Sequence, residues 1–260
     1  MSALKLHVER RGTGPAIVLS HGFGGSARNF RPQLRELSRD FEVVVYDTRG
    51  HARSPAPAPA EEYGEAELVA DLAQVVDTAH PPAIVGGLSL GAYTALQFAL
   101  EHPSRVKALI LASFPSTDAS STRAAWAIGF ADAIDRDGLE RAGEQFVWGP
   151  QSRFDEGARA FIRRGLLEHA PHALSAILRR VLAKIAEPDA RASELSRLDL
   201  PVLVIVGADD TPALAPCERL AALLPRAELK VVPGAGHVVN LAAPAEFNRL
   251  IADFVRRLPS

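Results

Sequence analysis

Short apolar runs rich in valine, isoleucine and leucine alternate along this chain with longer segments in which apolar residues recur every three or four positions. The short runs are typical of strands that are buried on both faces of a parallel sheet, and the longer segments are typical of helices that cover such a sheet. This alternation predicts an α/β fold, with a mostly parallel central sheet and helices on both of its faces.

The alternation can be assigned to individual segments. The strand pattern is found in residues 4–10, 16–20, 41–46, 83–86, 106–112, 202–207 and 229–232, and the helix pattern in residues 30–39, 65–79, 90–101, 213–224 and 245–258. Between residues 114 and 196, helical patterns follow one another without a strand candidate longer than three residues. We therefore expect a core formed by residues 1–113 and 197–260, with a helical insertion at 114–196 that forms a cap.

Composition and charge exclude several classes of protein. Hydrophobic residues make up 47% of the 260 residues and charged residues 23%, which is typical of a folded globular chain and not of a disordered one. With 29 Lys and Arg against 31 Asp and Glu, the net charge is −2, so there is no general positive field to attract nucleic acid. We expect no nucleic acid partner, and the composition leaves the oligomeric state open.

The apolar runs also bear on location. None approaches the roughly 18 residues that a membrane-spanning helix needs, and charged residues interrupt the amino-terminal segment where a secretory signal would be apolar. The single cysteine, Cys217, cannot form an internal disulfide. We therefore expect a cytoplasmic protein that does not associate with membranes.

The sequence Gly-Leu-Ser-Leu-Gly at residues 87–91 lies between a strand candidate and a helix candidate. A serine at such a sharp strand-to-helix turn is exposed at the carboxyl edge of the sheet, and the helix that follows directs its backbone N–H groups toward the same place. This context makes Ser89 a candidate nucleophile. The alternative is that Ser89 only caps the helix.

A serine becomes nucleophilic only when a base removes its proton, and the base needs a group that orients it. Asp209 and Asp210 follow the strand candidate at 202–207, and His237 follows the one at 229–232. All three would lie on loops at the carboxyl edge of the sheet, together with Ser89. The residues alone do not decide which aspartate orients His237 and which caps the next helix.

With these motifs in order, the chain resembles the serine α/β-hydrolase superfamily over nearly its whole length, and most closely its compact bacterial esterases, enol-lactonases and perhydrolase-like members. The matching segments are His-Gly-Phe-Gly-Gly at 21–25, Asp-Thr-Arg-Gly-His-Ala-Arg-Ser at 47–54, the GxxD motif ending at Asp210, and Gly-Ala-Gly-His at 234–237. Ala52 stands where that family's signature usually has glycine. The resemblance favours Asp210 as the triad acid over Asp209 and Asp118, and it implies an oxyanion hole formed by the backbone N–H groups of Phe23 and Leu90.

The resemblance implies a cofactor-free serine hydrolase that cleaves a small carboxylic ester or lactone through an acyl-enzyme intermediate, with Ser89, Asp210 and His237 as its catalytic triad. A C–C bond hydrolase or a perhydrolase would use the same triad, and a ligand receptor on this scaffold would keep the triad without turnover. We expect no metal site, because Pro171 separates His169 from His172 and no third ligand has suitable spacing.

The insertion holds many of the few aromatic residues of the chain. A cap over a serine site needs an apolar inner face that contacts substrate and excludes water. On this argument we expect substrate contacts from Trp126, Phe130, Phe146 and Trp148.

Overall fold

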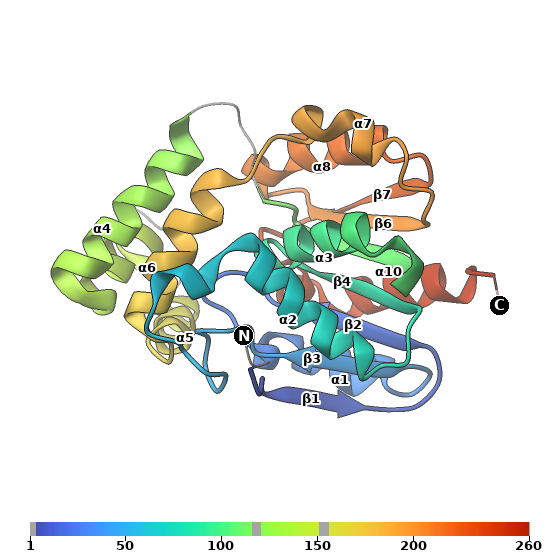
Figure 1. Cartoon of the computed structure of the whole chain (residues 1–260), viewed down its shortest axis with the longest axis horizontal. Coiled ribbons are helices and arrows are strands. Elements are labelled where there is room, and N and C mark those ends of the chain that lie inside the picture. Colours follow the sequence, from blue (N-terminus) through green and yellow to red (C-terminus); the bar gives the residue numbers. More distant parts are fainter. Residues whose placement is uncertain (1–3, 116–120, 151–155, 260) are drawn as a thin grey trace.

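The computed structural model describes residues 4–115, 121–150 and 156–259, and it contains one seven-stranded sheet (Figure 1). The strands are β1 (Val8–Arg11), β2 (Ala16–Ser20), β3 (Glu42–Tyr46), β4 (Ala83–Leu88), β5 (Val106–Ala112), β6 (Val202–Gly207) and β7 (Ala227–Val232). Their spatial order is β1-β3-β2-β4-β5-β6-β7, and only β1 is antiparallel to its neighbour. The predicted α/β class and the mostly parallel sheet are confirmed.

Ten α-helices accompany the sheet in the described part of the chain. They are α1 (Arg31–Leu37), α2 (Glu65–Asp77), α3 (Leu90–Glu101), α4 (Ser121–Gly143), α5 (Glu156–Leu166), α6 (Pro171–Arg180), α7 (Ala192–Leu195), α8 (Thr211–Leu223), α9 (Val239–Ala242) and α10 (Pro244–Arg256). A π-helical turn, Glu144–Trp148, continues α4. None of these helices has both the length and the apolar character that crossing a membrane requires.

Each face of the sheet has its own hydrophobic core, because successive residues of a strand point to opposite faces. Along β2, Val18 packs into the core on the side of α2, α3 and α8, while Ile17 and Leu19 pack into the core on the side of α1 and α10. All three side chains are completely buried. The uninterrupted apolar runs of the sequence are thus explained by burial on both faces.

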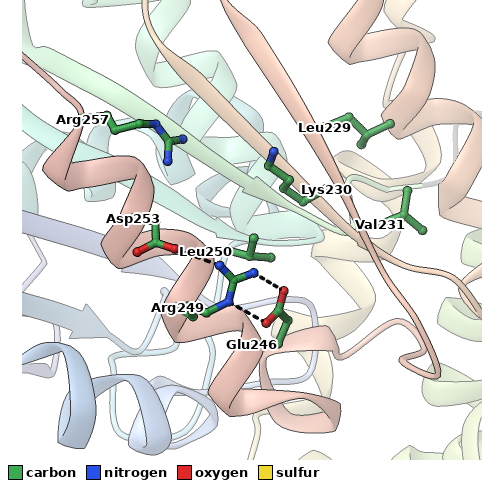
Figure 2. A pocket seen from close by; sticks show the side chains of 8 residues that line it. All are labelled: Leu229, Lys230, Val231, Glu246, Arg249, Leu250, Asp253 and Arg257. Carbon is green, nitrogen blue, oxygen red and sulfur yellow. Dashed lines mark hydrogen bonds and ion pairs between the residues drawn. The ribbon is translucent and has the colours of Figure 1, made fainter.

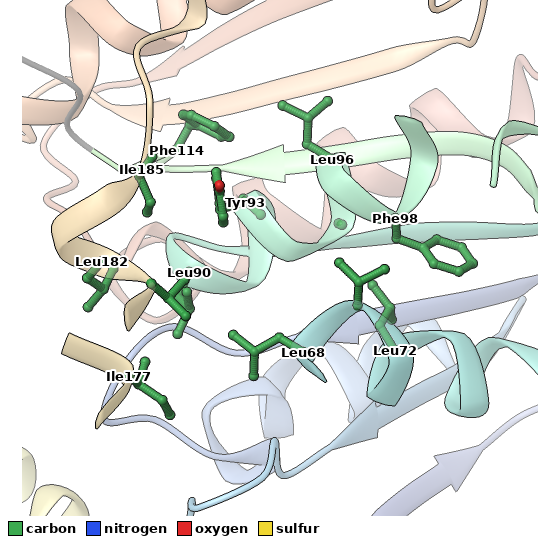
Figure 3. Close-up of a cluster of buried hydrophobic side chains, with 14 of the residues drawn as sticks. Leu68, Leu72, Leu90, Tyr93, Leu96, Phe98, Phe114, Ile177, Leu182 and Ile185 are labelled. Carbon is green, nitrogen blue, oxygen red and sulfur yellow. The ribbon is translucent and has the colours of Figure 1, made fainter. Parts of the chain in front are cut away.

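The helices α4, α5 and α6 lie together at one end of the sheet (Figure 1). Within α4, Gly138 has a non-helical backbone, so this helix consists of two segments. Figure 3 shows Ile177 of α6 in one buried cluster with Leu90 of α3 and Leu68 of α2. The helical insertion therefore packs against the beginning of α3, while its predicted limits at residues 114 and 196 stay a prediction.

Candidate active site

Ser89 occupies a sharp turn between β4 and α3. Its backbone has φ 52° and ψ −113°, a strained conformation for a residue with a side chain. The Ser89 N–H donates to the Ala112 carbonyl at 2.9 Å, which ties the turn to β5. A Cβ atom at Gly91 would lie 2.0 Å from the Ser20 carbonyl oxygen, so only glycine lets α3 approach β2 this closely. The turn therefore sets Ser89 directly after the end of β4, at the carboxyl edge of the sheet.

Asp210 and His237 are brought together from the loops after β6 and β7. His237 Nδ1–H donates to Asp210 Oδ2 at 2.8 Å. The Asp210 side chain is 4% exposed, whereas that of His237 is 47% exposed, so a buried carboxylate orients an accessible imidazole. No hydrogen bond links Ser89 Oγ and His237 in the described part of the chain. The predicted acid and base are therefore paired, while the serine lies at the same sheet edge.

The other two acid candidates differ from Asp210. Asp209 is exposed, and its backbone N–H donates to the Ala235 carbonyl at 2.9 Å. This bond ties the loop after β6 to the loop that carries His237. Asp118 lies outside the described residues.

The two predicted oxyanion donors belong to segments that adjoin Ser89. Leu90 is the first residue of α3, so its N–H has no acceptor within the helix. Phe23 lies in a turn that the Gly25 N–H closes by donating to the Gly22 carbonyl at 3.0 Å. A Cβ atom at Gly22 would lie 3.4 Å from Ser89 Cβ, which places this turn directly against the serine. Among residues 4–115, 121–150 and 156–259, no acceptor takes the Phe23 N–H.

Three buried histidines contact the turn at residues 22–25, which we call the oxyanion turn. The sequence analysis did not bring these histidines together. The ring centroids of His21 and His51 are 5.0 Å apart, and those of His51 and His169 are 4.9 Å apart. Burial lowers the pKa of His21 to about 4 and also lowers the pKa of His51 and of His169. The three rings are therefore neutral at pH 7. In the sequence they are far apart and share no motif, so no spacing signal connects them.

The loop that carries the 47–54 signature is braced by buried ion pairs. Arg49 donates to both carboxylate oxygens of Asp71 at 2.7 Å. Asp47 accepts from the Ala27 N–H at 2.7 Å and from Arg53 Nε at 2.8 Å, and these bonds outweigh burial and lower the pKa of Asp47. Ala52, which departs from the family pattern, has a left-handed backbone with φ 43°.

Three of the four aromatic residues predicted to contact substrate form one cluster. Phe130 is buried, stacks on Phe146 with ring centroids 5.1 Å apart, and lies 5.6 Å from the Trp126 ring. It also meets Phe23 edge-to-face at 6.2 Å, so the cluster adjoins the candidate oxyanion turn. Trp148 is buried elsewhere, since its ring fills the space where a Cβ atom of Gly143 would be.

A hollow of about 290 Å³ between β7 and α10 is a separate surface feature (Figure 2). Its charged lining is already paired: Arg249 donates to Glu246 and Asp253, and Lys230 and Arg257 both pair with Glu228. None of the residues that line it is a candidate site residue. Within the described ranges, no three metal-binding side chains are arranged to hold an ion.

Comparisons with known proteins identify the family of the chain. The chain is 33% identical over 269 residues to a Variovorax paradoxus protein named as carbamate hydrolase RutD, with 98% of this chain and 97% of that protein covered. It is 30% identical over 250 residues to a Bacillus subtilis protein named as 2-succinyl-6-hydroxy-2,4-cyclohexadiene-1-carboxylate synthase, with 92% and 90% covered. A solved structure of a thermophilic esterase from Thermogutta terrifontis matches with a TM-score of 0.86 at 26% identity, over 99% of this chain and 95% of that one. A family model described as alpha/beta hydrolase fold matches residues 15–244, and the chain therefore belongs to the α/β hydrolase fold family.

Proposed function

We propose that this protein is a serine hydrolase that cleaves a small carboxylic ester or lactone without a cofactor. The observation that carries the proposal is the pairing of an accessible His237 with a buried Asp210 at the sheet edge where Ser89 occupies its strained turn. A carboxylate buried against Nδ1–H leaves Nε2 free to act as a base, which is the arrangement that activates a serine.

In the proposed reaction, Ser89 Oγ attacks the substrate carbonyl carbon while His237 Nε2 takes the serine proton. The carbonyl oxygen becomes an oxyanion and accepts hydrogen bonds from the N–H groups of Phe23 and Leu90. His237 then gives its proton to the leaving alkoxide, and an acyl-serine remains. A water molecule that His237 deprotonates attacks the acyl carbon, releases the carboxylic acid and restores Ser89. Asp210 stabilises the imidazolium in both halves of the cycle.

We assign residues 114–196 to a cap whose aromatic cluster forms the apolar side of the substrate site. Phe130 supports this assignment, because its ring contacts Phe23 of the oxyanion turn. The exposed fraction of Trp126 is 38%, so part of its ring is available to an acyl or alkyl group. An apolar wall beside the bound substrate also excludes water from the oxyanion.

A carbamate is a second candidate substrate. The relative from Variovorax paradoxus, which is similar over nearly the full length of both chains, is named as a carbamate hydrolase. A carbamate presents the same carbonyl to Ser89 and needs the same oxyanion donors. Its cleavage would follow the same steps, with a carbamoyl-serine in place of the acyl-serine.

The test combines fluorophosphonate labelling, read by intact mass, with hydrolysis of p-nitrophenyl esters of increasing acyl length and of a p-nitrophenyl carbamate. We expect labelling at one site and turnover in the wild-type protein, and the loss of both in Ser89→Ala. The control is Ser104→Ala, which removes an exposed serine before β5 and should change neither. Turnover that survives in Ser89→Ala would refute the mechanism, and a folded wild-type protein without labelling or turnover would favour a ligand receptor.

A further inference from the structure

We propose that His21, His51 and His169 are positioning residues that together hold three consecutive peptide groups of the oxyanion turn, one histidine to each group. This inference rests on the proposed function, in which the Phe23 N–H of this turn binds the oxyanion. The three histidines come from the end of β2, from the loop after β3 and from the segment between α5 and α6. The insertion thereby becomes part of the catalytic machinery and not only a cover.

His21 fixes the peptide that carries the oxyanion donor. Its Nδ1–H donates to the Gly22 carbonyl at 2.8 Å, and its Nε2 accepts the Thr48 N–H at 3.0 Å. The Gly22 carbonyl and the Phe23 N–H belong to one planar trans peptide, so they point in opposite directions. By fixing the carbonyl from behind, His21 fixes the direction of the Phe23 N–H.

His51 holds the next peptide. Its Nε2 accepts the Gly24 N–H at 3.2 Å, so the proton of the neutral ring resides on Nδ1. Nδ1–H donates to the Arg49 carbonyl at 3.1 Å and lies 2.9 Å from Thr48 Oγ1. His51 therefore links the turn to the backbone of the loop that the Arg49–Asp71 ion pair braces.

His169 holds the third peptide, and it does so from the insertion. Its Nε2–H donates to the Gly24 carbonyl at 2.9 Å, while its Nδ1 accepts the Ala52 N–H at 2.8 Å. Leu166, three residues earlier, packs so closely that a Cβ atom at Gly24 would lie 2.6 Å from Leu166 Cδ1. Gly24 has φ 67°, which also favours glycine at this corner of the turn.

The chemistry of the contacts explains why each position is a histidine. Every ring donates one hydrogen bond and accepts one, which a neutral imidazole does with its two nitrogens and an alkyl, carboxylate or ammonium group cannot do. Each unprotonated nitrogen already faces a backbone N–H, so none of the three lone pairs is left to bind a metal. A positioning role accounts for all six nitrogens.

The inference is tested at His169 with two amide variants, each of which can replace one of the two ring nitrogens. The amide nitrogen of glutamine can replace Nε2 and keep the bond to the Gly24 carbonyl, whereas asparagine can replace only Nδ1 and keeps the bond to the Ala52 N–H. For a p-nitrophenyl ester that the wild-type protein hydrolyses, we expect kcat to fall roughly 10- to 100-fold in His169→Asn, with KM nearly unchanged, and to stay within about threefold of wild type in His169→Gln. The affinity for a trifluoromethyl ketone, which forms an oxyanion on Ser89, should fall in parallel with kcat.

The control is His172→Asn, three residues farther along, where an exposed histidine donates only to the Pro57 carbonyl. We expect wild-type kinetics from it. Equal kcat in folded His169→Asn and wild type, or a rise in KM alone, would overturn the positioning role while the proposed function stands. A wild-type protein without turnover would overturn both. If His169→Asn does not fold, His169→Gln decides alone, because a tenfold loss of kcat there contradicts the inference.

Discussion

Two adjacent aspartates follow β6, and their surroundings give them different roles. Asp210 is buried and accepts from His237, whereas Asp209 is exposed and contributes only its backbone N–H to the neighbouring loop. A difference of one position therefore separates the carboxylate that orients the imidazole from one that water solvates.

This contrast supplies a matched pair of variants. Asp210→Asn removes the negative charge that stabilises the imidazolium and lets the wrong tautomer form, so we expect kcat to fall on the order of 10³- to 10⁴-fold. Asp209→Asn changes the same atoms at an exposed site and should leave kcat within about twofold of wild type. Steady-state ester hydrolysis by both variants measures the difference, and equal losses in the two would contradict the assignment.

At this scale the sequence predicts candidates for the nucleophile, acid and base, because each follows a strand at the edge where sites of α/β folds form. Strand position does not separate Asp210 from Asp209, and the choice of Asp210 comes from the family resemblance. The sequence does not predict the histidine cluster. His21 and His51 lie on loops after neighbouring strands, but His169 joins them only because α5 and α6 pack on the core, and that contact depends on tertiary structure. The same reason explains why Trp148, which has the same aromatic character as Phe130, packs against Gly143 and not in the aromatic cluster.

Among the elements, the β4–α3 unit sets the position of Ser89, the proposed nucleophile. Both glycines of its motif are needed for close backbone approach, since a Cβ atom at Gly87 or at Gly91 would meet the Ser20 carbonyl oxygen at 2.4 or 2.0 Å. The unit therefore fits only if α3 stays against β2. Any group that pushes it away moves the Leu90 N–H as well as Ser89.

Gly91→Ala should accordingly cost at least about 2 kcal/mol of unfolding free energy, because a rigid backbone atom must move to admit the methyl group. The control is Gly165→Ala in α5, where a Cβ atom meets nothing within 4 Å. Alanine there gains about 0.5–1 kcal/mol from its higher helix propensity. Urea denaturation measures the change in unfolding free energy for both variants, which should have opposite signs. A stabilised Gly91→Ala would show that the turn is not constrained by close packing.

The strand and helix pattern of the core was predictable from periodicity, because each core helix covers one face of a sheet whose apolar runs are long and regular. The insertion was less predictable. Glycines at 129, 138 and 143 interrupt the helical pattern of the insertion, but within α4 only Gly138 has a non-helical backbone. Which glycine breaks the helix, and the π-helical turn at Glu144–Trp148, depend on how α4 packs against its neighbours.

For the whole molecule, the histidine cluster connects the insertion to the sheet through polar contacts that require neutral rings. Protonation would place an N–H where each ring now accepts a backbone N–H, so each bond would become a repulsion. The charges near the cluster are Asp47, Glu168 and Arg28, and they change the pKa values less than burial does. Stability and activity should therefore share a dependence on acid pH.

The sign of that dependence follows from the pKa values. In the unfolded chain a histidine titrates near pH 6.5, while burial lowers the pKa of His21 in the folded protein to about 4. Between these values the unfolded chain binds the proton and the folded protein does not, so the unfolding free energy falls as pH falls from about 6.5 to 4. His21 alone would account for a loss of about 3 kcal/mol over this range, and His51 and His169 add to it. The lowered pKa of Asp47 acts only at lower pH.

Urea denaturation at intervals from pH 7.5 to 4.5 measures this loss. His169→Gln removes one of the three titrating rings and keeps its contact with the Gly24 carbonyl, so its stability should decline less steeply with acid than that of the wild type. The control is His80→Asn, which removes an exposed histidine whose φ of 52° asparagine tolerates, and it should leave the slope unchanged. An unfolding free energy that stays constant from pH 6.5 to 4.5 would mean that the cluster is protonated or accessible to water in the folded protein, and the contacts that hold the oxyanion turn would then have to be different from those described.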